Sequence, residues 1–373
     1  MTQDAPTRGV VVSVNRRRFL IGGAAVGGAL LLGGCGGSEE AGGGGASEAA
    51  GGASEASSAA AGGGGGGGGL TIVHVPKWTT FPYFQAANAG AEKAASELGH
   101  SVTYTGPTEP NAEQQVATLQ TVLAQNPDVI MLAAIEPDNV APVLTRAMEQ
   151  GITVVTYDAD CQKDARNMYC NQLTYELAAQ SYLDAALMCD PEGGGVAFMA
   201  ATPTTANHIG QIDAMKALIA QGGDYGVFEV GETYFVEDDV AQSVDTMTNI
   251  MESDPSVKYM LSGSAVSVPA ACQAIEAAGR TGEVWATGAA LPGDIKPYLE
   301  SGVGKAFALW DPAELGYMAA YAGHLIANGE LEVAEGTSWE AGELGEFTIE
   351  ADNITNYNKP IIFTPDNIDD YDW

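Results

Sequence analysis

Apolar residues follow two alternating spacings from Leu70 to about residue 328. Short, nearly continuous apolar runs predict buried strands, and the segments between them carry apolar residues three or four positions apart, which predicts helices. The first set of strands is expected at 70–75, 101–106, 128–134 and 152–158, with helices at 84–98, 111–125 and 138–150.

A second set of the same kind begins near Thr174. Its strands are expected at 195–201, 225–230, 257–263 and 283–288, and its helices at 174–188, 207–221, 238–252 and 267–279. A helix near 293–301, a strand at 304–310 and a helix at 312–328 follow, before an irregular end with a possible strand at 346–350.

This alternation predicts an α/β fold with two doubly wound parallel-sheet lobes joined by a hinge, because continuously apolar strands must be covered on both faces. We expect the N-terminal lobe to hold 70–172 and 311–336, and the C-terminal lobe to hold 173–310 and 337–373. The carboxyl ends of both sets of strands would then face a shared cleft for a small molecule.

The segment before the folded region has the pattern of an export leader. Arg16, Arg17 and Arg18 precede a short apolar run at 19–34 that ends in small residues before Cys35. The run is shorter than the roughly 20 residues of a membrane span, and its arginine spacing resembles a twin-arginine signal. Residues 1–35 are therefore predicted to be a lipoprotein signal ending at a lipidated Cys35, with a short uncleaved anchor as the alternative.

Residues 36–69 consist mainly of Gly, Ser, Ala and Glu and are predicted to be a flexible linker. The glycine run at 62–69 lacks the Lys-Ser/Thr of a phosphate-binding loop. Together with the leader, this composition places the folded domain outside the cytoplasm, lipid-anchored to the outer face of the cell membrane and otherwise out of contact with it.

The chain carries 48 acidic and 15 basic residues, for a net charge of −33. Such a charge repels nucleic acid, which is excluded as a partner. The four histidines have no metal-ligand spacing, so neither a metal nor a cofactor is expected. Of the five cysteines, Cys161 and Cys170 flank a polar stretch of hairpin length and are predicted to form a disulfide. Cys189 and Cys272 either form a second disulfide or remain thiols.

Polar and aromatic residues recur where the predicted strands end. Lys77 follows the first strand with Phe84 close behind it, and Asp158 and Asp160 follow the fourth. Each also has an ordinary interpretation, since a loop lysine can be solvated and a loop carboxylate can cap a helix or form an ion pair.

The later strands end in a similar way. Asn207 and His208 follow the strand at 195–201, Ala265 lies in the loop after 257–263, and Trp310 and Asp311 follow the last strand. Asn207 could simply cap a helix, and Trp310 could fill the core. Carboxylates and amides bind hydroxyl groups and aromatic faces cover sugar C–H groups, so the set predicts a sugar or polyol site.

The stretches 106–116 (GPTEPNAEQQV), 136–160, 308–312 (ALWDP) and 363–373 (FTPDNIDDYDW) resemble the type I, ribose-binding-like sugar-binding proteins of ABC importers. Within that family, the domain from 70 to 373 is most similar to the autoinducer-2 and rhamnose receptors. The resemblance implies a monomer that delivers its ligand to an ABC permease and its ATPase partner.

The autoinducer-2 receptors hold their ligand through a lysine, an aspartate, an Asp-Gln pair and a Pro-x-Ala segment. Lys77 and Asp158 match the first two. Asn207 and His208 replace the pair, and Gly263-Ser264-Ala265 replaces the third element without its proline. The resemblance therefore implies a small sugar such as rhamnose or a pentose, with autoinducer-2 as the alternative. A carbohydrate-cleaving enzyme is disfavoured because the sequence places no second carboxylate opposite Asp158.

Overall fold

The computed structural model describes residues 69–371 and 373, so the predicted leader and all of the predicted linker except Gly69 lie outside the described residues. The first lobe is built on six parallel strands in the order β13-β5-β4-β3-β1-β2. These are β1 (Thr71–Val75), β2 (Ser101–Tyr104), β3 (Val129–Leu132), β4 (Thr153–Tyr157), β5 (Met168–Asn171) and β13 (Ile354–Asn356).

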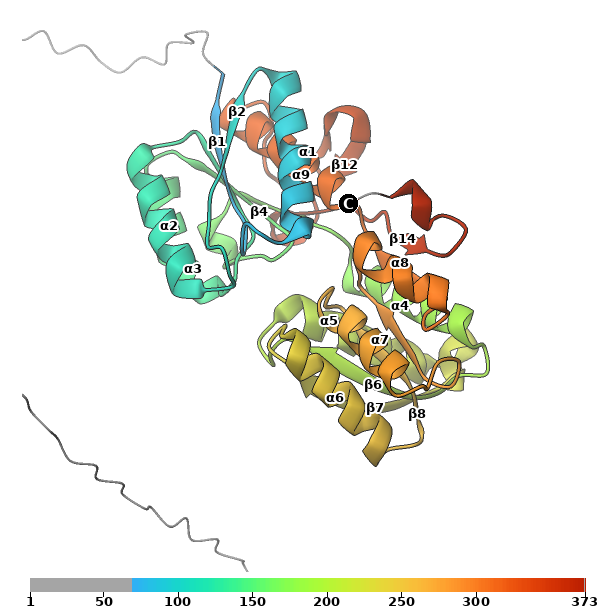
Figure 1. Ribbon diagram of the computed structural model, residues 1–373. Helices are drawn as coiled ribbons and strands as arrows, with labels where there is room; N and C mark the ends of the chain where they lie inside the picture. The colour runs from blue at the N-terminus through green and yellow to red at the C-terminus, as the bar shows by residue number, and fades with distance from the viewer. Residues whose placement is uncertain (1–68, 372) are drawn as a thin grey trace, which may run out of the picture. The chain divides into compact units, whose positions relative to one another are not determined.

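Helices cover both faces of this sheet, and every residue of its central strands β3 and β4 is therefore buried. The helices α1 (Pro82–Leu98) and α9 (Pro312–Ala327) pack together on one face. The helices α2 (Ala112–Gln125) and α3 (Pro137–Glu149) pack together on the other, as Figure 1 shows.

The second lobe has four parallel strands in the order β7-β6-β8-β9. These are β6 (Gly194–Ala200), β7 (Phe228–Phe235), β8 (Val257–Ser262) and β9 (Trp285–Gly288). Its helices are α4 (Tyr175–Cys189), α5 (Ala206–Gln221), α6 (Val240–Ser253), α7 (Ser267–Ala277) and α8 (Pro292–Ser301). The predicted α/β fold with parallel sheets is confirmed.

The C-terminal part of the chain divides between the lobes. The hairpin of β11 (Ser338–Glu340) and β12 (Glu346–Thr348) leads into β13, which pairs with β5 of the first sheet. The chain then returns to the second lobe, where β14 (Ile361–Phe363) pairs with β10 (Phe307–Leu309) and Asp369 forms an ion pair with Lys296 of α8. The prediction that 337–373 belongs wholly to the second lobe is therefore wrong, because residues up to 356 complete the first sheet.

The predicted disulfide between Cys161 and Cys170 is also wrong, since both are buried free thiols. Cys170 lies on β5 and faces the core beneath α1 and α9, whereas Cys161 packs into the core beneath α2 and α3. The two sulfur atoms thus lie on opposite sides of one sheet. Cys189 and Cys272 are likewise free and buried.

A buried histidine links β1 to the end of β4. His74 Nδ1 lies 3.0 Å from Asn88 Oδ1, and His74 Nε2 lies 2.6 Å from the Tyr157 hydroxyl. Asn88 donates its amide to Glu92 at 2.8 Å, so its oxygen accepts from Nδ1–H while Nε2 accepts from Tyr157. This arrangement requires a neutral ring, and burial lowers the pKa of His74 to about 4.

We predict from this histidine that acid destabilises the domain. Between pH 6.5 and about 4 the unfolded chain binds a proton at residue 74 that the folded chain does not, so stability falls as pH falls. The loss from this group should be about 2 kcal/mol between pH 8 and pH 5. Urea denaturation at both pH values measures it. The variant His74→Gln should be less stable at pH 8 and lose less on acidification, and an equal acid loss in both proteins would contradict the assignment.

Within the described residues, no helix reaches both the length and the apolar character that crossing a bilayer demands.

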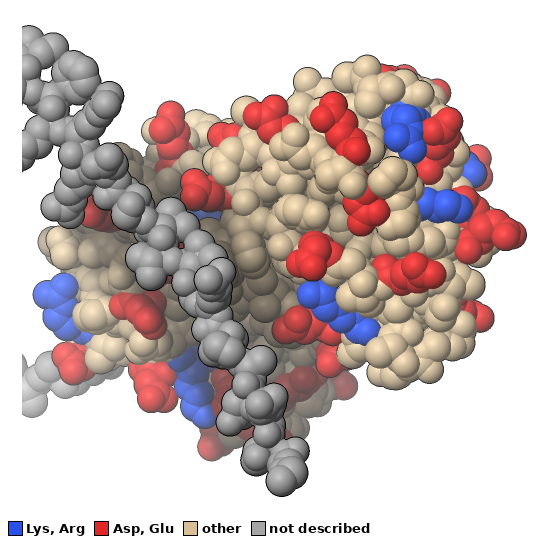
Figure 2. Space-filling view, turned by 90° about the horizontal axis from the view of Figure 1, so that it is seen from below, with Lys and Arg blue, Asp and Glu red and all other residues tan. Residues whose placement is uncertain are grey.

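The surface of the described region is strongly acidic. Figure 2 shows carboxylate side chains spread over the displayed face, with few basic side chains among them.

Candidate ligand-binding site

A pocket lies where the carboxyl ends of strands from both lobes meet. The first lobe contributes Lys77, Trp78, Phe81, Tyr83, Phe84 and Asp158. The second lobe and the crossover contribute polar groups from Asn207, His208, Asp238 and Ser264, and apolar surface from Ala265, Leu309 and Trp310. The predicted residues Lys77, Phe84, Asp158, Asn207, His208, Ala265 and Trp310 are therefore brought together.

The polar centre of the first lobe is an ion pair. Lys77 Nζ lies 3.0 Å from Asp158 Oδ2, with side chains only 18% and 7% exposed. The two residues follow β1 and β4, which are separated in the sheet by β3 alone. The pair presents one ammonium donor and one carboxylate acceptor to the pocket while leaving that wall electrically neutral.

Gln115 fixes the ends of two strands beside this pair. Its side-chain amide, fully buried on α2, donates to the carbonyl oxygens of Pro76 (3.0 Å) and Ala133 (2.8 Å). Its oxygen accepts from the Ile135 N–H at 2.9 Å. Gln115 therefore bridges the segments that follow β1 and β3 and fixes the loop that carries Lys77.

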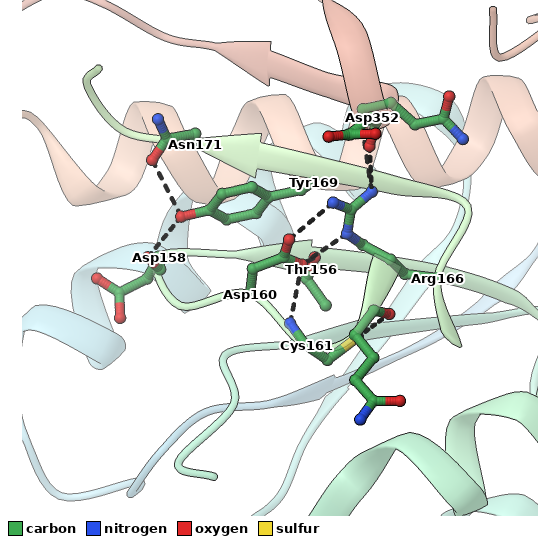
Figure 3. A network of polar contacts seen from close by, with 10 residues as sticks. Thr156, Asp158, Asp160, Cys161, Arg166, Tyr169, Asn171 and Asp352 are labelled. Atoms are coloured by element: carbon green, nitrogen blue, oxygen red, sulfur yellow. Dashed lines mark hydrogen bonds and ion pairs between the residues drawn. The ribbon is translucent and has the colours of Figure 1, made fainter. Parts of the chain in front are cut away.

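Asp158 occupies a backbone conformation that non-glycine residues seldom adopt. Its φ is 59°, in the left-handed region, where Asn and Asp are the best-tolerated residues after Gly. The Tyr169 hydroxyl donates to the Asp158 carbonyl oxygen at 2.9 Å and stabilises this turn (Figure 3). Strained residues of this kind concentrate at functional sites.

Aromatic rings form the wall beside the ion pair. Trp78 contacts Phe81 and Phe84, with ring centroids 5.0 and 5.5 Å apart. Trp310 packs edge-on against Tyr83 and donates its indole N–H to the Tyr83 hydroxyl at 2.8 Å. This bond ties the crossover between the lobes to α1, so Trp310 is fixed in orientation as well as packed.

His208 presents a neutral donor to the pocket. Its Nδ1 accepts a hydrogen bond from the Ala201 N–H at 3.2 Å, which places the ring proton on Nε2. Burial lowers the pKa of His208, an effect that nearby Asp238 opposes. Because His208 lines the pocket and no group in the described residues bonds Nε2, the Nε2–H is available to a ligand oxygen.

Asn207 lies inside the first turn of α5, not at its cap. The N-cap position belongs to Thr205, and the amide of Asn207 lines the pocket. Gly263 also lines the pocket, and the space beside it explains why it has no side chain, since a Cβ there would overlap the side-chain oxygen of Gln211. The pocket wall at residue 263 therefore consists of backbone.

Two predicted residues, Asp160 and Asp311, have other roles. Asp160 accepts from Arg166 with both oxygens, from Nε at 2.6 Å and from Nη2 at 2.7 Å, and it also accepts from the Thr156 hydroxyl (Figure 3). Arg166 also donates through Nη1 to the Asp352 carbonyl oxygen, which joins this network to the segment before β13. Asp160 does not line the pocket described above.

Asp311 caps α9. Its Oδ1 accepts from the N–H groups of Ala313 (2.8 Å) and Glu314 (3.3 Å), which satisfies donors left free by the helix start. Asp311 is also absent from the residues that line the pocket. The structure thus assigns it a structural role in place of the predicted ligand contact.

Sequence reasoning missed Asp238, which follows β7 and puts a second carboxylate in the pocket. A second, larger cavity of about 320 Å³ shares Lys77, Asp158 and Asn207 with the first. Asp160 and Tyr169 lie along it. Lys77, Asp158 and Asn207 therefore form a wall that is common to both cavities.

Residues 72–331 match the periplasmic binding protein domain family. A sugar ABC transporter protein from Actinomyces odontolyticus is 32% identical, with a TM-score of 0.70 over 82% of this chain and 98% of that one. A solute-binding protein from Clostridium phytofermentas with bound L-rhamnose is 28% identical, with a TM-score of 0.74 over 81% of this chain and 98% of that one.

A more distant relative is the xylose/arabinose-binding protein of Sulfolobus acidocaldarius. It is 26% identical over 206 residues, which are 52% of this chain. The match spans 50% of the length of that relative.

Proposed function

We propose that this chain, which belongs to the periplasmic binding protein family, is the sugar-binding component of an ABC transporter and holds a neutral monosaccharide between its lobes. Members of this family bind solutes and are not enzymes. The observation that carries the proposal is the pocket in which the Lys77–Asp158 pair and an aromatic wall face Asn207, His208 and Asp238.

The charges of the pocket favour a neutral ligand. One lysine and two carboxylates line it, so an anionic ligand such as a sugar phosphate would meet net repulsion. Carboxylate oxygens, an amide and the His208 N–H together accept from and donate to hydroxyl groups, which is the chemistry a polyol requires.

The apolar wall favours a 6-deoxyhexose of the rhamnose type or a pentose. Trp78, Phe84 and Leu309 offer surface to a methyl group or to the C–H face of a ring but no partner for an extra hydroxyl. Relatives described with L-rhamnose or as binding xylose and arabinose support this choice.

Binding would couple to closure of the lobes. Three connections, near residues 173, 310 and 358, join the two sheets. Ligand hydroxyls that bond Asp158 on one lobe and His208 on the other favour the closed arrangement over the open one. The shift equals the difference between the ligand's binding free energies for the two arrangements. The permease and its ATPase would then receive the sugar from the closed monomer.

The leader pattern supports a position outside the cytoplasm. Arg16-Arg17-Arg18, the short apolar run and Cys35 match an export signal with a lipidation site. A lipid on Cys35 and the glycine-rich segment after it would keep the domain close to the permease in the membrane.

Autoinducer-2 is the second candidate ligand. Lys77 and Asp158, the two residues that match its receptors, form the ion pair in this pocket. The second-lobe residues Asn207 and His208 depart from those receptors, which favours a sugar.

The test is a thermal-shift screen of the purified protein against pentoses, hexoses, deoxyhexoses, polyols and autoinducer-2. A ligand at 100 times its Kd should add about 2.7 kcal/mol to the stability of the folded state. We expect a shift with rhamnose or a pentose. A shift with autoinducer-2 alone would replace the sugar proposal with the signalling one.

A further inference from the structure

Three acidic residues in a row follow β7, and they have three different environments. Glu237 is exposed to solvent. Asp239 is the N-cap of α6 and accepts from the Gln242 N–H at 2.8 Å. Asp238, between them, lines the pocket. The cap is already made by Asp239, so helix capping does not explain the position of Asp238.

The backbone turns Asp238 toward the pocket. Glu237 and Asp238 have φ values of 53° and 52°, two consecutive left-handed residues without a glycine. The turn is anchored by Val236 N–H to Ala200 carbonyl at 3.0 Å and Glu237 N–H to Ala201 carbonyl at 2.8 Å. The cost of this conformation is met by the surrounding contacts.

Ser264 fixes the side chain of Asp238. The Ser264 hydroxyl accepts from the N–H groups of Val266 and Ser267, both at 3.2 Å, at the start of α7. Its single proton is then free for Asp238 Oδ1, which accepts it at 2.5 Å. Ser264 is only 2% exposed, so this support is rigid.

The opposite oxygen of Asp238 has no such partner. No group in the described residues bonds Oδ2, although Oδ1 is satisfied. His208 lines the same pocket as Asp238 and Asp158. The second lobe therefore offers a carboxylate acceptor beside a neutral imidazole donor, the pairing that binds two neighbouring hydroxyls of one sugar.

We propose that Asp238 is a specificity-determining ligand residue of the second lobe, whose free carboxylate oxygen accepts from a sugar hydroxyl on the side opposite Asp158. This inference rests on the proposed function. It makes the pocket select ligands with hydroxyl groups on two sides of the ring, and Ser264 acts through Asp238 as its positioning residue.

The experiment is calorimetric titration of the full chain with L-rhamnose, D-xylose and L-arabinose, comparing wild type, Asp238→Asn and Glu237→Gln. We expect Asp238→Asn to weaken the affinity for the sugar that wild type binds on the order of 10- to 100-fold, because one hydrogen bond to a charged group is lost. Glu237→Gln removes the same charge from the neighbouring left-handed position outside the pocket and should leave binding unchanged.

Monodeoxy analogues of the bound sugar separate a contact from a structural effect. The loss of affinity caused by Asp238→Asn should be smaller for the analogue that lacks the hydroxyl bound by Asp238. An equal loss of affinity for every analogue overturns the inference. Equal affinities of Asp238→Asn and Glu237→Gln overturn it as well and leave the proposed function standing. No binding of any of the three sugars by wild type overturns both the proposed sugar class and the inference.

Discussion

Replacing Asp158 with asparagine should weaken sugar binding by about 2–4 kcal/mol, roughly a 30- to 1,000-fold rise in Kd. The change removes a carboxylate that is only 5% exposed. It also leaves Lys77 Nζ without its counter-ion, because in the wild type this atom lies 3.0 Å from Asp158 Oδ2. Asparagine tolerates the left-handed backbone at this position, where φ is 59°, so the turn itself is preserved. Calorimetric titration with the sugar that wild type binds measures the loss.

Asp164→Asn is the matched control for this variant. Asp164 is an exposed carboxylate six residues further along the chain and lies outside both cavities. It should bind as wild type does. If Asp158→Asn folds with an unchanged melting temperature and keeps wild-type affinity, the pocket identified above is not the sugar site.

The first-lobe half of the site could be predicted because its strands are short, apolar and parallel. Their carboxyl ends are easy to locate in the sequence, and parallel pairing brings those ends to one edge. Lys77, Phe84 and Asp158 all meet at the pocket for this reason. The same reasoning found Asn207, His208 and Trp310.

Strand-end position could not separate ligand groups from structural ones. Asp160 and Asp311 also follow strands, but a local partner binds both oxygens of Asp160 and one oxygen, Oδ1, of Asp311. Arg166 lies only six residues from Asp160, and the start of α9 supplies free N–H groups to Asp311. Which way a loop carboxylate turns depends on the three-dimensional positions of such partners.

Asp238 was missed because the end of its strand was misplaced. The apolar pattern at 225–230 predicted a strand ending at 230, whereas β7 runs from Phe228 to Phe235. Residues 228–235 include exposed polar positions, since β7 is an edge strand of its sheet. The position of Asp238 at a strand end therefore depended on pairing with β6, not on the local pattern.

Long-range pairing also explains the error in lobe assignment. The strands β5 and β13 have only four and three residues, too few for a clear period. They are stabilised by pairing with each other, although 185 residues of chain separate the paired positions. The hairpin-length spacing of Cys161 and Cys170 suggested a local turn. In fact β5 continues the parallel sheet beside β4, which places the two thiols on opposite faces.

The α1–α9 pair should be intolerant of a single methyl group. Gly90 on α1 lies against the backbone of Ala313, and Gly316 on α9 lies against the backbone of Ala87, so each helix places a glycine at the crossing. A Cβ at residue 316 would overlap the Ala87 carbonyl oxygen, which belongs to backbone and cannot rotate away. Gly316→Ala should therefore cost about 3 kcal/mol or more of unfolding free energy, measured by urea denaturation.

Gly226→Ala is the control for the glycine variant. A Cβ there meets nothing within 4 Å, so the change should alter stability by less than about 1 kcal/mol. The α1–α9 crossing also bears on binding, because α1 carries Tyr83 and Phe84 and α9 begins directly after Trp310 and Asp311. If the helices were forced apart, the Trp310–Tyr83 bond would lengthen, so Gly316→Ala should weaken sugar binding as well as folding. A variant as stable as Gly226→Ala would show that the helices can separate freely and that their close approach does not hold the pocket wall.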